Sequence, residues 1–164
     1  MITLNYAWRL RRIPHPQRSA FKRLAVRAAK LAKLPDTGDW ELNICFVGDR
    51  AMTKANAEFV GHAGSTDVIT FSYFDDLESV FPGEAAVELI ICADAAVREG
   101  EKRVNSSYSR EMVLYLVHGL LHSAGEDDLT PEARRKMRRK EREVMSKLER
   151  EFDFAQIFPE VSQD

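Results

Sequence analysis

Four short segments of the chain are predicted to be β-strands from their pattern of apolar and polar residues. The first alternates between the two, and the third is rich in β-branched and aromatic residues. The predicted strands are Ile2–Trp8, Trp40–Val47, Thr66–Tyr73 and Ala86–Cys92. A helix is predicted between the first two strands, so these two are expected to be parallel with a right-handed connection.

Apolar residues at helical spacing predict about five helices. The first begins at Pro14-His15-Pro16 and runs to about Lys33, and Pro35 and Gly38 then end it. The second helix is predicted to run from Asp49, its cap, to about Phe59, and the third over Asp94–Lys102. The fourth is predicted from Ser106 or Ser107 to Gly125, and the fifth from Thr130-Pro131 to about Arg150. The apolar tail, Phe152 to Phe158, is expected to pack onto the body. The sequence therefore predicts one α+β domain over residues 1–164, with a four-stranded, mostly mixed sheet.

The composition is that of an ordinary soluble domain: 164 residues, 45% hydrophobic and 30% charged. No segment approaches the ~18 consecutive apolar residues of a membrane span. At the N-terminus the charges follow a short apolar patch, which is unlike a secretory signal. Cys45 and Cys92 lie in apolar strand segments, so both are predicted to be buried and reduced. These features favour a cytoplasmic protein.

Positive charge is concentrated near the two ends of the chain, although the net charge is only −2. Residues 1–35 carry nine Lys and Arg and no acid, whereas residues 36–128 carry 18 acids against six bases. A second basic cluster spans Arg134–Arg142. Such surfaces can contact nucleic-acid phosphates, and a solvated helix face explains the same pattern equally well.

The candidate metal-binding residues are concentrated in residues 118–128, whose sequence is His-Gly-Leu-Leu-His-Ser-Ala-Gly-Glu-Asp-Asp. His118 and His122 are four residues apart in a predicted helix, which places their Cβ atoms about 5–6 Å apart and lets both rings bind one metal ion. Most single buried histidines are instead hydrogen-bonded to a carbonyl. The predicted helix is apolar on every side, which indicates that it is buried and that both histidines lie near the core.

A third metal ligand is predicted just beyond this helix. Gly125 is expected to end the helix in a left-handed conformation, so that the chain turns back toward the histidines. Asp128 is the favoured ligand, with Asp127 and Glu126 as alternatives. Three protein ligands leave a coordination position for water, as in catalytic zinc sites, and the carboxylate also admits manganese or iron.

Gly119 argues against a peptidase. Metalloproteases of the zincin type place a glutamate, their general base, directly after the first histidine, where this chain has Gly119. We expect this glycine to leave open space beside the metal for a bulkier substrate.

Residues 118–128 resemble the HGxLHxxGxDH signature of the YbeY family, and further matches follow the same order. Asn56, Phe59 and Gly61, together with Thr66–Phe71, are similar to the family's N-x-x-Y-R-G and TDVLSF segments, and Glu88–Cys92 is similar to its GDIxI strand. The resemblance covers residues 50–145. It implies a zincin-like, metal-dependent hydrolase fold.

The resemblance also implies a function. Members are metal-dependent endoribonucleases, so the chain is expected to cleave single-stranded RNA in small-subunit ribosomal RNA maturation and ribosome quality control. Zn²⁺ is the expected cofactor, held by His118, His122 and Asp128. RNA and the ribosome are the expected partners, and the RNA backbone is expected to contact basic residues of the two helices, Arg23, Arg27, Arg134 and Arg138.

The chain departs from the family pattern at two positions. Asp128 replaces the third histidine, which makes the site about one charge unit less positive. Val60 replaces an arginine that suits a phosphodiester or its transition state, so either another arginine (Arg50, Arg98 or Arg110) substitutes or hydrolysis is feeble.

Four further polar residues are predicted to have no direct part in metal binding or in contact with the substrate. Asp67 and Glu88 are interpreted as hydrogen-bonding anchors in preference to substrate contacts. His62 is predicted to be solvated and His15 to be structural or exposed.

Two other functions are consistent with the residues. One is a non-catalytic ribosome-assembly factor with a structural metal. The other, an iron oxygenase with two histidines and one carboxylate, is weakly supported, because its ligands usually lie on strands of a different fold.

Overall fold

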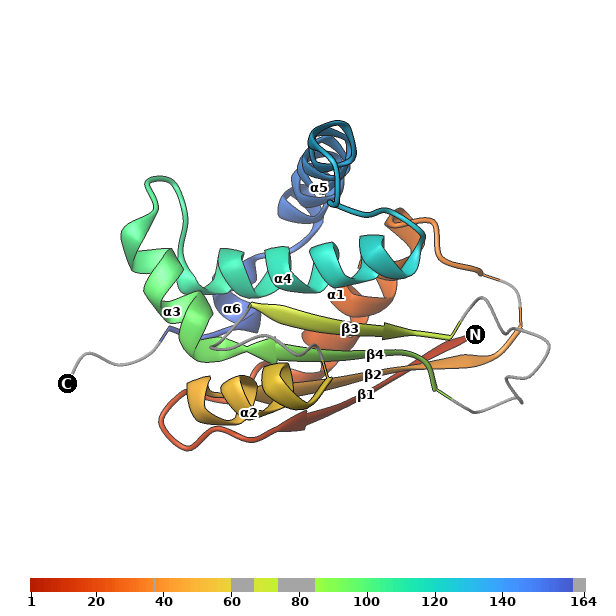
Figure 1. The fold of residues 1–164 in the computed structure, drawn as a ribbon. Helices are drawn as coiled ribbons and strands as arrows, with labels where there is room; N and C mark the ends of the chain where they lie inside the picture. The colour runs from red at the N-terminus through yellow and green to blue at the C-terminus, as the bar shows by residue number, and fades with distance from the viewer. Residues whose placement is uncertain (37, 60–66, 74–84, 161–164) are drawn as a thin grey trace.

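The structure is a computed structural model that describes residues 1–36, 38–59, 67–73 and 85–160 (Figure 1). Strands and helices follow the order predicted from the sequence. They are β1 Ile2–Trp8, α1 Arg18–Leu31, β2 Trp40–Val47, α2 Asp49–Phe59, β3 Val68–Ser72, β4 Ala85–Cys92, α3 Ala93–Lys102, α4 Tyr108–Ser123, α5 Pro131–Glu151 and α6 Phe154–Ile157.

The four strands form one mixed sheet in the order β1-β2-β4-β3. β1 is parallel to β2, β2 is parallel to β4, and only β3 is antiparallel to its neighbour β4. The predicted mixed sheet and the predicted parallel first pair are therefore confirmed. In β1 and β2 every second side chain faces the core, and Ile2, Leu4, Leu42 and Ile44 on this face are buried, which leaves the alternate residues on a second, more open face.

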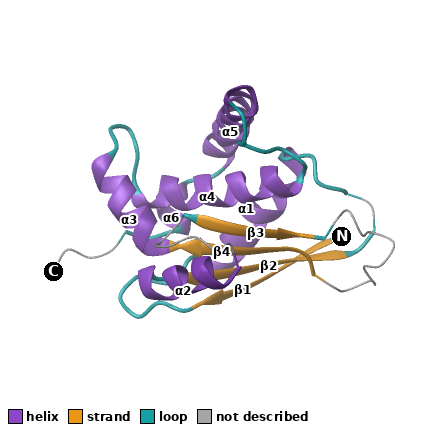
Figure 2. Ribbon diagram, in the orientation of Figure 1, coloured by secondary structure: helices purple, strands orange, loops and turns teal. Residues whose placement is uncertain are grey.

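The helices cover the two faces of the sheet unequally (Figure 2). α1, α4, α5 and α6 lie on one side, and α2 lies on the other (Figure 1). α4 approaches the sheet closely, because a Cβ atom built on Gly119 would lie 2.8 Å from Leu89 and 3.2 Å from the hydroxyl of Thr70. Gly119 therefore faces the sheet. The expectation that it opens space beside the metal is wrong.

The core between α1 and the sheet is aromatic. Phe21, Phe46 and Phe158 are almost fully buried, and their rings pack edge to face with centroids 5.4–6.1 Å apart. Phe158 follows the short helix α6, so the predicted packing of the tail is confirmed. α6 makes the described helices six where about five were expected.

Two helix starts differ from the prediction for reasons of capping. α1 begins at Arg18, after the prolines, because the Gln17 side chain accepts a hydrogen bond from the backbone N–H of Ala20 at 2.6 Å. Asp49 is the first residue of α2 and not its cap. The cap is supplied by Asp94, whose carboxylate accepts from the Asp49 N–H at 2.8 Å.

Cys45 and Cys92 are not joined in a disulfide. Cys92 is buried as predicted, whereas Cys45 is only half-buried because it lies on the more open face of the sheet. His15 is exposed and its ring lies 5.8 Å from that of Trp8. No helix in the described part of the chain combines the length and the apolar character needed to cross a membrane.

Candidate metal centre

His118 and His122 lie on the last two turns of α4. This helix forms because Ser107 caps its start, accepting from the Arg110 N–H at 3.1 Å, and because apolar side chains surround it. The two rings lie edge to face with centroids 4.6 Å apart, and their Nε2 atoms are 3.0 Å apart. Both nitrogens are thus directed to one point, as the spacing predicts.

The chain turns sharply after α4 and brings back Asp128. Gly125 adopts φ +102°, a conformation in the left-handed range, and its N–H donates to the His122 carbonyl at 3.0 Å. Asp128 Oδ2 then lies 4.0 Å from His118 Nε2 and 3.9 Å from His122 Nε2. The three side chains bring ligand atoms within 4.8 Å of one another.

The two competing acids in this turn have other partners. Asp127 accepts a hydrogen bond from the Leu129 N–H at 3.1 Å, which is a local turn contact. Glu126 pairs with Lys140 and lies 3.7 Å from Lys136, both on α5. Asp128 is therefore the acid that faces the two histidines.

The geometry fits a tetrahedral metal ion. Ligands about 2.0–2.1 Å from a zinc ion lie about 3.3 Å from one another at tetrahedral corners. The observed separations of 3.0, 3.9 and 4.0 Å lie on either side of this value. Two imidazoles and one carboxylate are also a common catalytic zinc set.

Glu141 of α5 fixes the orientation of His118. Its carboxylate is hydrogen-bonded to His118 Nδ1, which leaves Nε2 directed at Asp128 and His122. Burial lowers the pKa of His118, but the hydrogen bond and charge of Glu141, together with the charges of Asp128 and Asp67, outweigh burial and raise it. Nothing in the local sequence indicates this role of Glu141, because only the packing of α5 against α4 brings it to the histidine.

His122 is in a different electrostatic environment. Burial, and then the nearby charge of His118, lower its pKa. A neutral imidazole is the form that binds metal, so this environment favours ligation.

A cleft of about 340 Å³ opens beside the three residues, between β3, α4 and α5. Its lining is mostly polar and charged. It includes His118, Asp128, Glu141, Asp67, Tyr115, Arg103, Arg134 and Arg138. Arg134, Arg138 and Glu141 follow one another at helical spacing, so one face of α5 forms this wall.

Arg103 is an arginine of the cleft that the sequence pattern did not indicate. Its guanidinium lies 2.9 Å from Glu99 and 3.3 Å from Glu111, a carboxylate that is 0% exposed. These two acids hold the arginine at the end of α3. The three arginines that were predicted to substitute for the family arginine do not line the cleft. Arg98 pairs with Asp49, Arg110 pairs with Glu149, and Arg50 is exposed on α2.

Asp67 lies at the rim of the cleft. Its backbone carbonyl accepts from the Cys92 N–H at 2.9 Å, which ties the start of β3 to β4. Partial burial of its carboxyl group, and then the charge of Glu99, raise the pKa of Asp67. The backbone of Asp67 is thus an anchor, while its side chain faces the cleft. Val60 and His62 lie outside the described residues.

The predicted RNA contacts on α1 do not line the cleft. Arg27 forms three hydrogen bonds to Glu151, at 2.9, 3.1 and 3.3 Å, and Glu151 is the last residue of α5. Arg134 lies near the other end of this 21-residue helix, which is about 30 Å long. Arg23 is exposed on α1. Of the four predicted arginines, only Arg134 and Arg138 adjoin the candidate metal site.

Comparison with known proteins gives consistent matches. The family model described as Endoribonuclease YbeY matches residues 9–149. A protein named Endoribonuclease YbeY from Anaeromyxobacter sp. is 36% identical over 131 residues, which are 79% of this chain and 66% of the relative. The one from Chlorobium phaeovibrioides is 36% identical over 126 residues, 73% of this chain and 80% of the relative.

The matched segment thus spans slightly less than two thirds of the Anaeromyxobacter relative. Among solved structures, a Thermotoga maritima protein determined in solution aligns with a TM-score of 0.57 and 22% identity. This alignment covers 92% of this chain and 91% of that protein, and it supports the fold alone.

Proposed function

Because this chain belongs to the YbeY family of endoribonucleases, we propose that it is a metal-dependent endoribonuclease that cleaves single-stranded RNA. The observation that carries the proposal is the convergence of His118, His122 and Asp128 beside a cleft that contains arginines. An open three-ligand site in such a cleft suits phosphodiester hydrolysis better than a structural role, which normally closes the coordination sphere with four protein ligands.

In this proposal His118, His122 and Asp128 hold one Zn²⁺ ion, with Mn²⁺ or Fe²⁺ as substitutes. Bound zinc supplies Lewis acidity toward a phosphoryl oxygen and lowers the pKa of water. Glu141 orients His118, and Asp128 contributes a negative charge that partly offsets the charge of the ion.

The arginines of the cleft bind the phosphates of the RNA. Arg134 and Arg138 extend from one wall, and Arg103, held by Glu99 and Glu111, extends from the end of α3. A guanidinium presents several N–H donors to phosphate oxygens and keeps its charge at any physiological pH. We assign to Arg103 the role of the family arginine that Val60 replaces.

Membership in the family also suggests the biological setting. We propose small-subunit ribosomal RNA as the substrate class, with roles in its maturation and in ribosome quality control in the cytoplasm. The ribosome is then the macromolecular partner.

A cleavage assay tests the enzyme proposal. Zinc-loaded protein is expected to cut a labelled single-stranded RNA and to leave the same sequence intact when it is annealed to its complement. Chelated protein and the His118→Ala variant, purified in parallel, are expected to lose this activity, which excludes a contaminating nuclease. Equal cleavage by the loaded protein and His118→Ala would disprove the proposed site.

Metal content tests the ligand assignment independently of activity. After dialysis against zinc, the wild-type protein is expected to retain one ion per chain, and Asp128→Ala to retain much less. Asp127→Ala is the matched control, because its carboxylate contacts the Leu129 N–H. Undiminished zinc in Asp128→Ala would overturn the assignment.

The alternative is a non-catalytic ribosome-assembly factor with a structural metal. The replacement of the family arginine by Val60 favours it. Single-turnover assays with enzyme in excess separate the two functions, since an assembly factor would bind RNA and leave it uncut under all metal conditions.

A further inference from the structure

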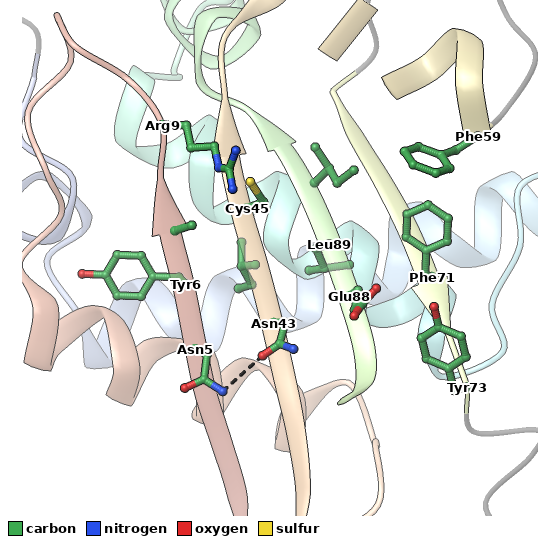
Figure 3. A pocket seen from close by; sticks show the side chains of 13 residues that line it. Asn5, Tyr6, Arg9, Asn43, Cys45, Phe59, Phe71, Tyr73, Glu88 and Leu89 are labelled. Carbon is green, nitrogen blue, oxygen red and sulfur yellow. Dashed lines mark hydrogen bonds between the residues drawn. The ribbon is translucent and has the colours of Figure 1, made fainter. Parts of the chain in front are cut away.

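The sheet face opposite α1 and α4 contains a second cavity, of about 650 Å³ (Figure 3). It lies on the side of the sheet that carries α2, whereas the metal cleft lies between β3, α4 and α5. We call it the sheet-face pocket and define it by Asn5, Asn43, Glu88, Phe59, Phe71 and Tyr73.

A polar row crosses the floor of the sheet-face pocket. The strand register places Asn5 beside Asn43 and Asn43 beside Glu88. Asn5 Nδ2 donates to Asn43 Oδ1 at 3.2 Å, so the Asn43 amide N–H groups remain available as donors. Since adjacent strands lie about 4.8 Å apart, the row offers donors and acceptors at regular intervals over about 10 Å.

Aromatic side chains border this row at the β3 end (Figure 3). Phe71 is paired with Glu88 in the register, and Phe59 of α2 packs edge to face on Phe71 with ring centroids 5.4 Å apart. Phe59 and Tyr73 are 58% and 41% exposed, which is unusual for large aromatic residues. Partial burial and the hydrogen bond to Glu88 raise the pKa of Tyr73.

We propose that the sheet-face pocket binds unpaired nucleotides of an RNA strand, outside the metal cleft. Exposed rings beside hydrogen-bonding side chains on a sheet match the two features of a splayed base, a π face and a polar edge. Arg9, at the β1 side of the pocket, supplies a cation for a phosphate. This inference rests on the proposed function, because it assumes that RNA is the ligand.

Glu88 predicts which bases bind. Its carboxylate accepts hydrogen bonds and cannot donate them, so it favours the bases with an exocyclic amine (adenine, cytosine and guanine) over uracil, whose Watson–Crick edge offers a single N–H. An apolar peptide segment would instead cover the Asn43 amide N–H groups without offering them an acceptor. The chemistry therefore favours RNA over a protein partner.

Cys45 provides a probe inside the sheet-face pocket, since it is half-buried there while Cys92 is buried. Chelated protein, which leaves RNA uncut, is treated with N-ethylmaleimide with and without saturating dodecaadenylate, and modification is followed by intact mass. We expect the oligonucleotide to slow Cys45 modification at least about fivefold, and dodecauridylate to protect less at the same concentration. Unchanged Cys45 reactivity while fluorescence anisotropy shows bound RNA would overturn the proposal.

Affinity measurements test the aromatic border. Phe59→Ala and Tyr73→Ala are each expected to weaken dodecaadenylate binding about fivefold or more, as for loss of a stacked base. Both rings are exposed, so folding is preserved. Val104→Ala, at another exposed apolar residue (89% exposed), is the matched control and is expected to bind normally. Equal affinity of all three variants would contradict the assignment.

These outcomes separate this inference from the proposed function. RNA cleavage with unprotected Cys45 would refute only the sheet-face pocket. Protection of Cys45 by RNA that the zinc-loaded protein never cuts would support the pocket and refute the nuclease.

Discussion

The orientation of His118 depends on a hydrogen bond from outside its own helix. Glu141 holds Nδ1, so the ring presents Nε2 to the point that His122 and Asp128 also face. Metal-binding histidines commonly depend on such a partner for tautomer and direction. Glu141 is 17% exposed, which limits the competition of water for this bond.

Glu141→Ala is therefore expected to weaken zinc binding about 10- to 100-fold. Glu141→Gln keeps an acceptor without the charge, so it is expected to retain an intermediate affinity. Competition with a chromophoric chelator measures both. Glu143→Ala changes an exposed acid on the same helix and is the control. If Glu141→Ala and Glu143→Ala bind zinc equally well, Glu141 does not position the ligand.

At the residue scale the sequence predicted the histidine pair and favoured Asp128 as the third ligand, with Asp127 and Glu126 as alternatives. Four-residue spacing on a helix places His118 and His122 together regardless of what surrounds the helix. The choice among Glu126, Asp127 and Asp128 depends on the path of the turn and on the lysines of α5, which local sequence does not encode. Glu141 and Arg103 were missed because both reach the cleft only through helix packing.

The turn between α4 and α5 is an element in its own right, because it carries Asp128. Its link to α5 is the pair between Glu126 and Lys140, whose side chains are 14% and 37% exposed. The hydrogen bond from Lys140 is the main cause that lowers the pKa of Glu126. The pair is thus expected to stabilise the turn mainly while Glu126 is ionised.

Lys140→Met is expected to lower the free energy of unfolding of the metal-free protein by less than about 1 kcal/mol near neutral pH, because the pair is partly screened. A lowered folded-state pKa gives stability above the unfolded value of about 4.3, and this stability is lost as pH falls through the folded pKa. The difference between wild type and variant should therefore be constant from pH 6 to 8 and shrink steadily as the pH falls below about 4.3. Urea unfolding at several pH values measures it, and a difference that stays the same as the solution is acidified would exclude the pair as its cause.

α5 shows what helical periodicity can and cannot predict. Thr130-Pro131 and the run of charged residues predicted its start and length closely. The periodicity also places Arg134 and Arg138 on one face, with Arg135 and Arg139 on another. Only packing against α4 shows that the first face lines the cleft, and the sequence could not distinguish it from solvated surface.

A comparison of the two faces of α5 tests this assignment. Arg134→Ala with Arg138→Ala is expected to weaken binding of single-stranded RNA about tenfold at moderate salt. The slope of log affinity against log salt should fall by about 1 to 2, as for two lost phosphate contacts. Arg135→Ala with Arg139→Ala removes the same charge from exposed positions and is expected to have a much smaller effect. Equal losses in both double variants would indicate diffuse electrostatics without a defined contact surface.

For the whole molecule, alternation and helical spacing predicted the order of elements, the parallel first pair and the mixed sheet. The strand order β1-β2-β4-β3 and the unequal covering of the two faces depend on contacts between distant segments. The sheet-face pocket was missed for the same reason. Asn5, Asn43 and Glu88 are far apart in the sequence and become neighbours only through the register.

The core of the molecule is independent of the metal site. Phe21, Phe46, Phe158 and the apolar side of α4 are packed without any contribution from His122 or Asp128. Metal removal is thus expected to leave the fold intact and to lower its stability only by the binding free energy, about 2.7 kcal/mol at a free zinc concentration 100 times Kd. For a domain of this size that corresponds to a fall in Tm of roughly 5–11 °C.

Circular dichroism during heating, with zinc and with chelator, measures this shift. The His118→Ala variant should unfold near the Tm of the chelated wild type and show no response to zinc. A cooperative transition that survives chelation would show that the protein folds without zinc, as expected for a catalytic ion. Loss of cooperative unfolding on chelation would mean that zinc completes the fold, and it would favour the assembly factor with a structural metal over the nuclease.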